Sequence, residues 1–243
     1  MDQYSRTGFL LGKENMEKLK KAHVAVFGLG GVGGYAVEAL ARSGVGELTL
    51  VDHDTVSLTN LNRQILATHS TVGMEKALAA QKRVEDINPA IKVNAVCGFF
   101  GPDTKGNFDF TAYDYVVDAI DTVTGKLALV MACKEANTPI ISSMGAGNKL
   151  DATAFRVSDI YKTTVDPLSR IMRKECRKRG IESLKVVWSP EEPIVCTLPP
   201  DDPAWAELPQ GRNALPGSCA WVPSAVGLII AGEVVKEIIN YKL

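Results

Sequence analysis

Residues 22–34 read AHVAVFGLGGVGG, and this stretch decides the fold. Its first six residues form a short apolar, β-branched run that ends in glycines, which is typical of a buried parallel strand. Gly28, Gly30 and Gly33 then match the G-x-G-x-x-G pattern that joins a strand to a helix. Such a loop presents bare backbone N–H groups at the positive end of the helix, so it predicts a phosphate-binding edge. Taken alone, the pattern is as typical of a dinucleotide-dependent dehydrogenase as of any other nucleotide-binding enzyme.

Strand-like and helix-like segments alternate after this loop. This alternation predicts an α/β fold with a Rossmann-like, doubly wound and mostly parallel sheet, covered on both faces. We expect one domain over residues 1–243, with a core at about 20–150, a crossover and substrate-binding extension at about 151–220 and a C-terminal helix at about 222–240. The expected strands are 22–27, 47–51, 91–96, 115–119, 139–143 and an added strand within 152–158; the expected helices are 31–42, 75–87 and 124–136.

Charge and cysteine usage narrow the class of protein. The net charge of −1 gives no general attraction to nucleic acid or membranes, so any such binding needs a local basic patch. The five cysteines are odd in number and form no C-x-x-C pair, which argues against a four-cysteine zinc site and a disulfide scaffold. Reduced thiols and the absence of an apolar N-terminal segment favour a cytoplasmic protein.

An uncharged run near the C-terminus, residues 225–232, is far too short to cross a bilayer and predicts no stable membrane insertion. We expect it to belong to a buried or dimer-interface helix, and weak association with a membrane surface stays open as an alternative.

Polar residues beyond the second strand distinguish ATP from NAD. Asp52 ends that strand, where a carboxylate accepts hydrogen bonds from ribose hydroxyls in either case. The loop at 60–64 then carries two asparagines, Arg63 and a glutamine, and Lys76 follows on the next helix. A hydride-transfer enzyme needs no pair of cations at the phosphates, whereas an adenylating enzyme must stabilise the charge that grows on its triphosphate. Surface roles for Arg63 and Lys76 remain the alternative.

Two aspartates, Asp118 and Asp121, lie at the end of the fourth strand, where ligands bind in open α/β sheets. Mg²⁺ prefers one or two carboxylates together with phosphate oxygens. We choose Asp121 as the expected metal ligand, and a capping role for the helix that starts near Thr124 is the alternative.

Together these pieces resemble the ubiquitin-activating superfamily in its bacterial adenylyltransferase branch, the ThiF-MoeB-HesA group. The matching segments are 28–34, 52–54, 60–64, Gly73 with Lys76, and 118–121, in family order. The resemblance implies ATP and Mg²⁺ as cofactors and catalytic roles for Arg63, Lys76, Asp121 and Arg6. Arg6 matches an arginine that in relatives reaches the partner subunit's ATP, which implies a homodimer. The implied cofactor-binding set is Gly28, Gly30, Gly31, Gly33, Asp52, Asp54, Asn60, Asn62, Arg63, Gln64, Lys76 and Asp121.

The later part of the chain resembles one branch more closely, the tRNA threonylcarbamoyladenosine dehydratases. The matching segments are 166–170, 173–180 and Gly217-Ser218 followed by 222–224. This resemblance implies ATP-dependent cyclisation of the modified adenosine through a carboxyl-adenylate, with release of AMP and pyrophosphate. It also implies the tRNA anticodon arm as a partner, and it leaves room for a sulfur-transfer (cysteine desulfurase) partner and a monovalent cation.

The basic segment supports tRNA binding on its own physics. Leu168, Ile171, Met172 and Cys176 recur at helical spacing and predict one apolar face. The cations on the rest of the helix predict a footprint on the phosphate backbone, with a solvated face as the alternative. These cations are Arg170, Arg173, Lys174, Arg177, Lys178 and Arg179.

Three other functions stay open at this point. An adenylyltransferase for the Gly-Gly tail of a sulfur-carrier protein would share the ATP site, but such enzymes usually carry two C-x-x-C pairs, which this chain lacks. Many also use a cysteine in the crossover, for which Cys196 is the fair candidate, with an inert thiol as the alternative. An NAD(P)-binding oxidoreductase and a non-catalytic nucleotide sensor remain as further alternatives.

Overall fold

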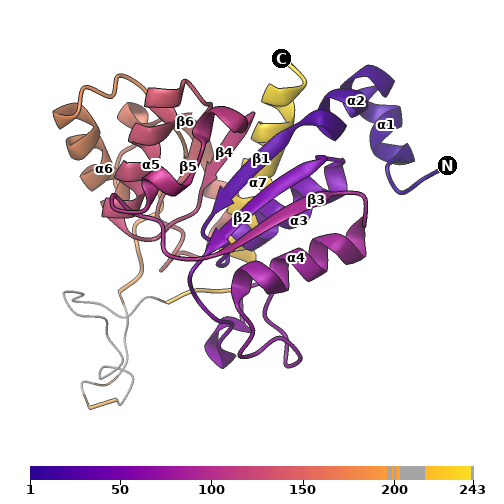
Figure 1. Ribbon diagram of the computed structural model, residues 1–243. Helices are drawn as coiled ribbons and strands as arrows, with labels where there is room; N and C mark the ends of the chain where they lie inside the picture. Colours follow the sequence, from indigo (N-terminus) through magenta and orange to yellow (C-terminus); the bar gives the residue numbers. More distant parts are fainter. Residues whose placement is uncertain (196–198, 200, 203–216, 242–243) are drawn as a thin grey trace.

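The computed structural model describes residues 1–195, 199, 201–202 and 217–241, and its centre is a seven-stranded sheet (Figure 1). The strand order is β3-β2-β1-β4-β5-β7-β6, and every pair is parallel except β6 with β7. The predicted Rossmann-like, mostly parallel sheet is therefore confirmed. The strands are β1 (His23–Phe27), β2 (Glu47–Asp52), β3 (Lys92–Cys97), β4 (Tyr115–Asp118), β5 (Ile140–Ser143), β6 (Arg156–Asp159) and β7 (Lys185–Trp188).

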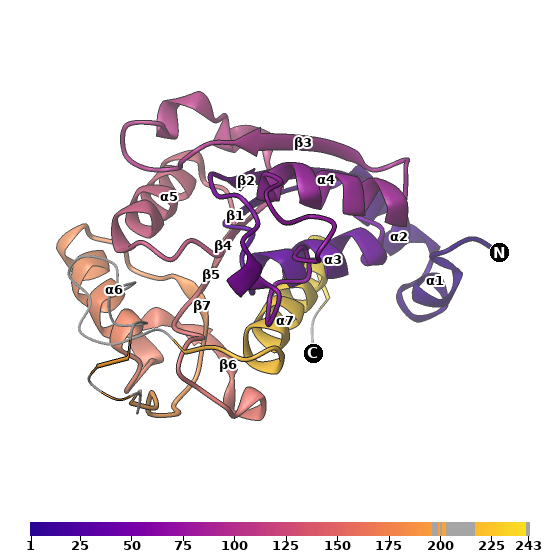
Figure 2. The ribbon, with the colours of Figure 1, turned by 90° about the horizontal axis from the view of Figure 1, so that it is seen from below.

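Helices cover both faces of this sheet, as Figure 2 shows from below. On one face α7 packs against α3, and α3 packs against α4. On the other face α5 lies against β4 and β5 and contacts α6. The helices are α1 (Ser5–Leu11), α2 (Lys13–Lys21), α3 (Gly33–Ser43), α4 (Lys76–Ile87), α5 (Val123–Ala136), α6 (Pro167–Lys178) and α7 (Trp221–Ile238); short 3-10 turns are η1 (Leu58–Asn60), η2 (Lys105–Asn107), η3 (Phe110–Ala112), η4 (Ala152–Ala154) and η5 (Ile160–Lys162).

The extension after residue 150 differs in detail from the prediction. The strand expected within 152–158 begins as the turn η4, because the Asp151 carboxylate accepts the Thr153 N–H, and β6 starts only at Arg156. Strand β7 was not predicted, since its four residues follow a turn-rich stretch and gain their structure by pairing with β5 and β6. Helices α1 and α2 were not predicted either. Most of the proline-rich stretch 189–216, including Cys196, lies outside the described residues.

Aromatic packing replaces a helix in the connection from β3 to β4. Phe27 on β1 contacts Phe100, Phe108 and Phe110 of this connection, with ring centroids 4.8–6.0 Å apart. Tilted and edge-to-face rings fill space densely and add to the hydrophobic gain of burying them. The loop that follows β3 is thereby held over the sheet, close to the edge at which parallel strands bind ligands.

The apolar C-terminal segment lies on the predicted helix, α7, and one face of that helix is buried while Leu228 is 51% exposed. Val222, Val226, Ile230 and Val234 of α7 are buried, and they belong to the core cluster that also contains α3. No helix among the described residues has the length and apolar character to cross a membrane. At Gly227 the two helices approach so closely that a Cβ would overlap the Val32 carbonyl oxygen of the segment leading into α3.

We therefore expect Gly227→Ala to lower the free energy of unfolding by about 1–3 kcal/mol, because overpacking must push the helices apart. Gly232→Ala on the same helix is the matched control: its Cβ would meet nothing within 4 Å, and alanine favours the helix. Urea titration followed by circular dichroism measures both changes. Equal stability of the two variants would contradict the packing argument.

Candidate active site

A cleft of about 540 Å³ opens at the carboxyl ends of β1, β2, β4 and β5. Its walls come from the glycine loop after β1, the segments after β2 and β3, the loops after β4 and β5, and Leu168, Gly217 and Ser218. Most of the predicted cofactor-binding residues line this cleft: Gly28, Gly30, Gly31, Asp52, Asp54, Asn60, Arg63, Gln64, Lys76 and Asp121.

Three glycines of the loop serve different needs. Gly28 has φ +87°, and a Cβ there would lie 2.5 Å from the Ala119 carbonyl oxygen of the neighbouring strand end. Gly33 does not line the cleft, and a Cβ there would overlap the Gly28 carbonyl, so its role is the close packing of α3 under the loop. Gly30 faces open space, with Gln64 Nε2 the nearest atom at 3.8 Å. The loop thus leaves backbone accessible to a ligand where a phosphate would approach.

Asp52 fastens the glycine loop to β2. Its carboxylate accepts the Leu29 N–H at 2.6 Å and the Asp54 N–H at 2.8 Å, one on each oxygen. Each carboxylate oxygen has a second lone pair, so Asp52 keeps acceptor capacity toward the cleft that it lines. The sequence did not predict these two hydrogen bonds. They hold the Asp52 carboxylate, which is the predicted ribose acceptor, in one orientation.

Lys76 supplies a buried positive charge to one wall. It is only 5% exposed, stands at the first position of α4 and bonds Asp54 Oδ2 at 2.7 Å. Burial would raise the pKa of Asp54, but the hydrogen bond and charge of Lys76 outweigh it and lower that pKa. A cation at the positive end of a helix is electrostatically unfavourable unless anions lie beside it. This corner therefore favours an anionic ligand in addition to Asp54.

The loop after η1 contributes a guanidinium and an unsatisfied amide. Arg63 Nη1 donates to the Thr59 carbonyl at 3.0 Å and to Asn62 Oδ1 at 2.9 Å. Burial lowers the pKa of Arg63, but a guanidinium stays charged at neutral pH. Gln64 Oε1 is buried without a hydrogen-bond partner among the described residues, although buried polar atoms are nearly always paired. A donor from a bound ligand would satisfy it.

Two of the predicted residues of this loop make hydrogen bonds within the protein. Asn60 is buried, and its Oδ1 accepts the Ser57 N–H at 3.1 Å, which closes a capping box around η1. Asn62 does not line the cleft; its Nδ2 donates to the Ser218 carbonyl at 3.1 Å. Asn62 therefore ties the segment before α7 across the mouth of the site.

Carboxylates lie at two places in the cleft where a metal ion could bind. Asp52, His53 and Asp54 form a cluster of ligand atoms within 4.8 Å of one another. Asp54 pairs with Lys76, and this neighbouring ammonium repels a further cation, so the cluster is poorly suited to a metal ion. Asp121 lies exposed on the cleft wall after β4, and Mg²⁺ prefers one or two carboxylates together with phosphate oxygens.

Asp118, the second aspartate of that segment, is fully buried and structural. It bonds Ser142 Oγ and Lys126 Nζ, and its other oxygen accepts the Ile120 N–H. Lys126 also donates to the Ser143 carbonyl at 2.7 Å. A second buried pair joins Lys149 to Asp166 at 3.1 Å. The sequence analysis predicted neither buried lysine. Lys126 stands inside an apolar segment, and this local pattern could have indicated a buried ion pair there.

The predicted basic helix exists as α6, with one correction to its apolar face. Met172 and Cys176 are buried, but Ile171 is 47% exposed, because the helix packs on α5 along a narrower stripe than the sequence spacing suggested.

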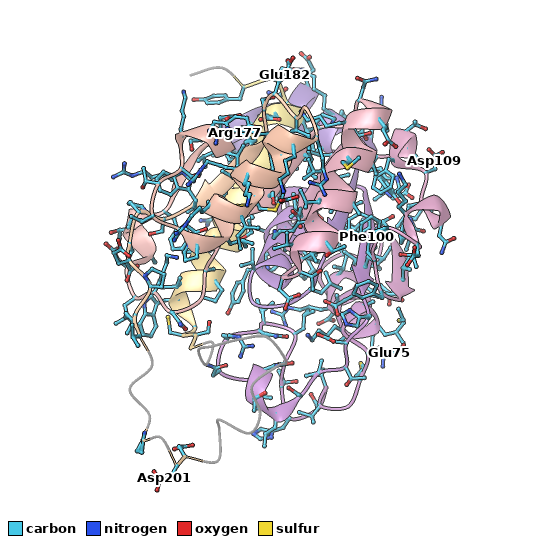
Figure 3. The ribbon with its side chains drawn as sticks, turned by 90° about the vertical axis from the view of Figure 1, so that its left-hand side faces the viewer. Glu75, Phe100, Asp109, Arg177, Glu182 and Asp201 are labelled. Atoms are coloured by element: carbon cyan, nitrogen blue, oxygen red, sulfur yellow. The ribbon has the colours of Figure 1, made fainter. Side chains whose placement is uncertain are left out.

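Four of its six cations have partners: Arg173 bonds Thr163, Arg177 stacks over Tyr161, and Lys178 and Arg179 pair with Glu175. The exposed Arg170 and Lys174 have no partner in the described part of the chain. Figure 3 shows Arg177 on α6 far from Glu75 at the other end of the molecule.

Arg6 does not join the cleft of its own chain. It is exposed on α1, and Tyr4 beside it bonds the Ala41 carbonyl near the end of α3. The end of α3 lies at the opposite edge of the sheet from the glycine loop (Figure 1). The cleft thus gathers ten of the twelve predicted cofactor-binding residues, and Gly33, Asn62 and Arg6 lie outside its lining.

Comparison with known proteins places this geometry in a family. The ThiF family model matches residues 4–243. The tRNA threonylcarbamoyladenosine dehydratase of Bacillus subtilis (strain 168) is 44% identical over 243 residues, covering 99% of this chain and 96% of the relative. A molybdopterin-synthase adenylyltransferase of Salmonella typhimurium (strain LT2) is 38% identical over 157 residues, covering 64% of this chain and 63% of the relative.

Among solved structures, the Escherichia coli tRNA N6-threonylcarbamoyladenosine dehydratase in complex with ATP is similar, with a TM-score of 0.86 and 32% identity. The match covers 98% of this chain and 94% of that one. The sequence similarity thus extends over the whole chain, and the glycine loop, the cations and the cleft agree with it. The chain belongs to the ThiF family.

Proposed function

We propose that this protein is an ATP-dependent tRNA threonylcarbamoyladenosine dehydratase. The observation that carries the proposal is full-length likeness to a dehydratase, 44% identity over 99% of the chain, combined with a cleft that presents the cations an adenylating enzyme needs. The threonyl carboxylate would attack the α-phosphorus of ATP, giving an acyl-adenylate and pyrophosphate. The ureido group of the same base would then attack the activated carbonyl, close a ring and expel AMP.

Charge stabilisation is the work assigned to the cleft residues. Lys76 and Arg63 would balance the negative charge that grows on the phosphates, Lys76 as a compact ammonium and Arg63 through its planar fork. The N–H groups around Gly30 would bind a phosphate, and Asp52 would bind the ribose. Asp121 would hold Mg²⁺, which neutralises the pyrophosphate when bound. Arg6 would reach the partner subunit's site, so we also propose a homodimer.

No enzyme nucleophile is needed, because the attacking ureido group already lies in the substrate at high effective concentration. Three of the four thiols among the described residues agree with this. Partial burial and the nearby Glu75 raise the pKa of Cys97 to about 11, and burial raises that of Cys133 to about 12 and that of Cys176 to about 11. Few of these thiols would be ionised at neutral pH.

The anticodon arm would bind along α6, where Arg170 and Lys174 are the cations with free capacity. We also propose a cytoplasmic location. A monovalent cation, a cysteine desulfurase partner and weak membrane association stay predictions from the sequence.

The first test measures AMP and pyrophosphate formed from ATP, with and without tRNA that carries the threonylcarbamoyl modification. We expect stoichiometric AMP and loss of one water from the modified base, detected by mass spectrometry of the digested nucleosides. Lys76→Ala should abolish both signals, whereas Lys82→Ala, an exposed lysine on the same helix, should leave them unchanged. Pyrophosphate exchange driven by a Gly-Gly carrier protein, with an unchanged base, would replace the proposal with the carrier-activating function.

The tRNA surface has its own test. Arg170→Ala and Lys174→Ala should each weaken tRNA binding and reduce the slope of log K against log salt by about 1, because each removes one phosphate contact. The affinity for ATP should not change. Filter binding over a salt series measures the slope, and Lys82→Ala is the control. An unaltered slope in both variants would show that α6 does not contact the backbone.

The variant Cys196→Ser tests whether the reaction needs a catalytic thiol. We expect AMP formation and base dehydration at the wild-type rate, because the cyclisation needs no thioester. A rate reduced by more than about 100-fold would point to covalent catalysis, since removing a true nucleophile costs at least that much.

A further inference from the structure

One loop connects nearly every part of the extension to the cleft. Residues 144–151 follow β5, and Gly145 and Gly147 form part of the cleft wall. Met144 N–H bonds the Val187 carbonyl of β7 at 2.8 Å. Asn148 N–H bonds the Gly217 carbonyl at 2.8 Å, and its own carbonyl accepts the Ile194 N–H at 2.7 Å. The same loop therefore positions β7 and holds Ile194 and Gly217 through backbone hydrogen bonds.

The Lys149–Asp166 pair lies at the centre of this arrangement. Both side chains are at most 1% exposed, and Lys149 Nζ lies 3.1 Å from Asp166 Oδ2. The same ammonium donates to the Gly145 carbonyl at 3.0 Å. Asp166 Oδ1 accepts the Gly145 N–H at 3.4 Å. Gly145 is thus held through both its backbone groups, and a Cβ there would lie 2.5 Å from Asp166 Oδ2.

The pair also fixes the start of α6. Asp166 is the N-cap of that helix, and its Oδ1 accepts the Ser169 N–H at 2.7 Å and the Ser169 hydroxyl at 2.8 Å. Leu168, in the first turn, lines the cleft. One carboxylate therefore joins the cleft wall at Gly145 to the helix that carries Arg170 and Lys174.

We propose that Lys149 and Asp166 are positioning residues that transmit the placement of tRNA on α6 to the substrate wall of the cleft, an inference that rests on the proposed function. The ion pair touches the wall through Gly145 and not the glycine loop, Asp52 or Lys76. Its loss should therefore impair the tRNA-dependent step while ATP binding persists. A rigid link suits this role, because a shift of about 1 Å at the reacting groups can slow a reaction about 100-fold.

Three variants test the pair. Asp166→Asn keeps a helix-capping side chain and removes the charge. Lys149→Met with Asp166→Asn removes both charges, so no unpaired buried ion opposes folding. Gly145→Ala leaves both charges and pushes a methyl group against Asp166. Glu38→Gln is the control for lost stability, because it weakens the ion pairs of Glu38 with Arg42 on α3 and with Arg83 on α4, which lie away from the cleft.

The readouts are the affinity for ATP, the kcat and KM for modified tRNA, and hydrogen exchange of the peptides covering 144–151 and 28–34. We expect kcat to fall by about 10- to 100-fold, with ATP affinity unchanged and faster exchange only in 144–151. Glu38→Gln should change neither kcat nor exchange in that loop.

A merely structural role would lower ATP affinity and kcat together and speed exchange in both peptides. That result, or folded variants with wild-type kcat and exchange, would overturn the inference. Absence of turnover in the wild-type protein would instead reject the proposed function, and the exchange data would still show whether the pair holds the loop.

Discussion

The close approach of the glycine loop to the end of β4 is the constraint on which the rest of the site depends. Gly28 at φ +87° and the bare Cα of Gly33 allow α3 to start directly behind β1, within contact of Ala119. Any side chain at either position would separate α3 from the sheet. With α3 in place, α7 packs on it through Gly227, and the Asp52 carboxylate reaches the Leu29 N–H. The nucleotide edge is thus built mainly from backbone groups.

Two buried ion pairs position the opposite wall of the cleft. Lys126 and Lys149 have almost no exposed surface, and each is paired with an equally buried aspartate. A buried ion pair is a weak source of net stability, because desolvation offsets much of the Coulomb attraction. Its hydrogen bonds are directional, however, and the two lysines donate to backbone carbonyls at the end of β5 and just after it, at Ser143 and Gly145. These pairs therefore determine where that wall lies more than how stable the protein is.

How far the sequence predicted this structure depends on the range of the interactions. Gly28, Gly30 and Gly31 of the glycine loop, the aspartates Asp52 and Asp121 and the cations Arg63 and Lys76 follow local patterns, and all of them line the cleft. Strand β7 and the start of β6 need partners distant in the chain, so four-residue patterns could not predict them. The roles of Asp118 and Asp166 depend on lysines that reach them only in the folded chain. Arg6 is a different case, because its expected contact lies on another subunit.

The difference between local and long-range interactions suggests how one nucleotide-binding edge can be combined with different substrate walls. The residues proposed to bind ATP are held by short-range geometry that few sequence changes can alter without separating β1 from α3. The wall proposed to meet the second substrate depends on Gly145, Asn148 and Gly217, whose positions are held by hydrogen bonds to the side chains of Asp166 and Asn148 and to backbone groups. Replacing a few side chains there would reshape the wall while the phosphate loop stays intact. Selection for a new carboxylate substrate would therefore act first on the extension. Within it, the buried Lys149–Asp166 pair most directly joins helix α6 to the cleft wall at Gly145.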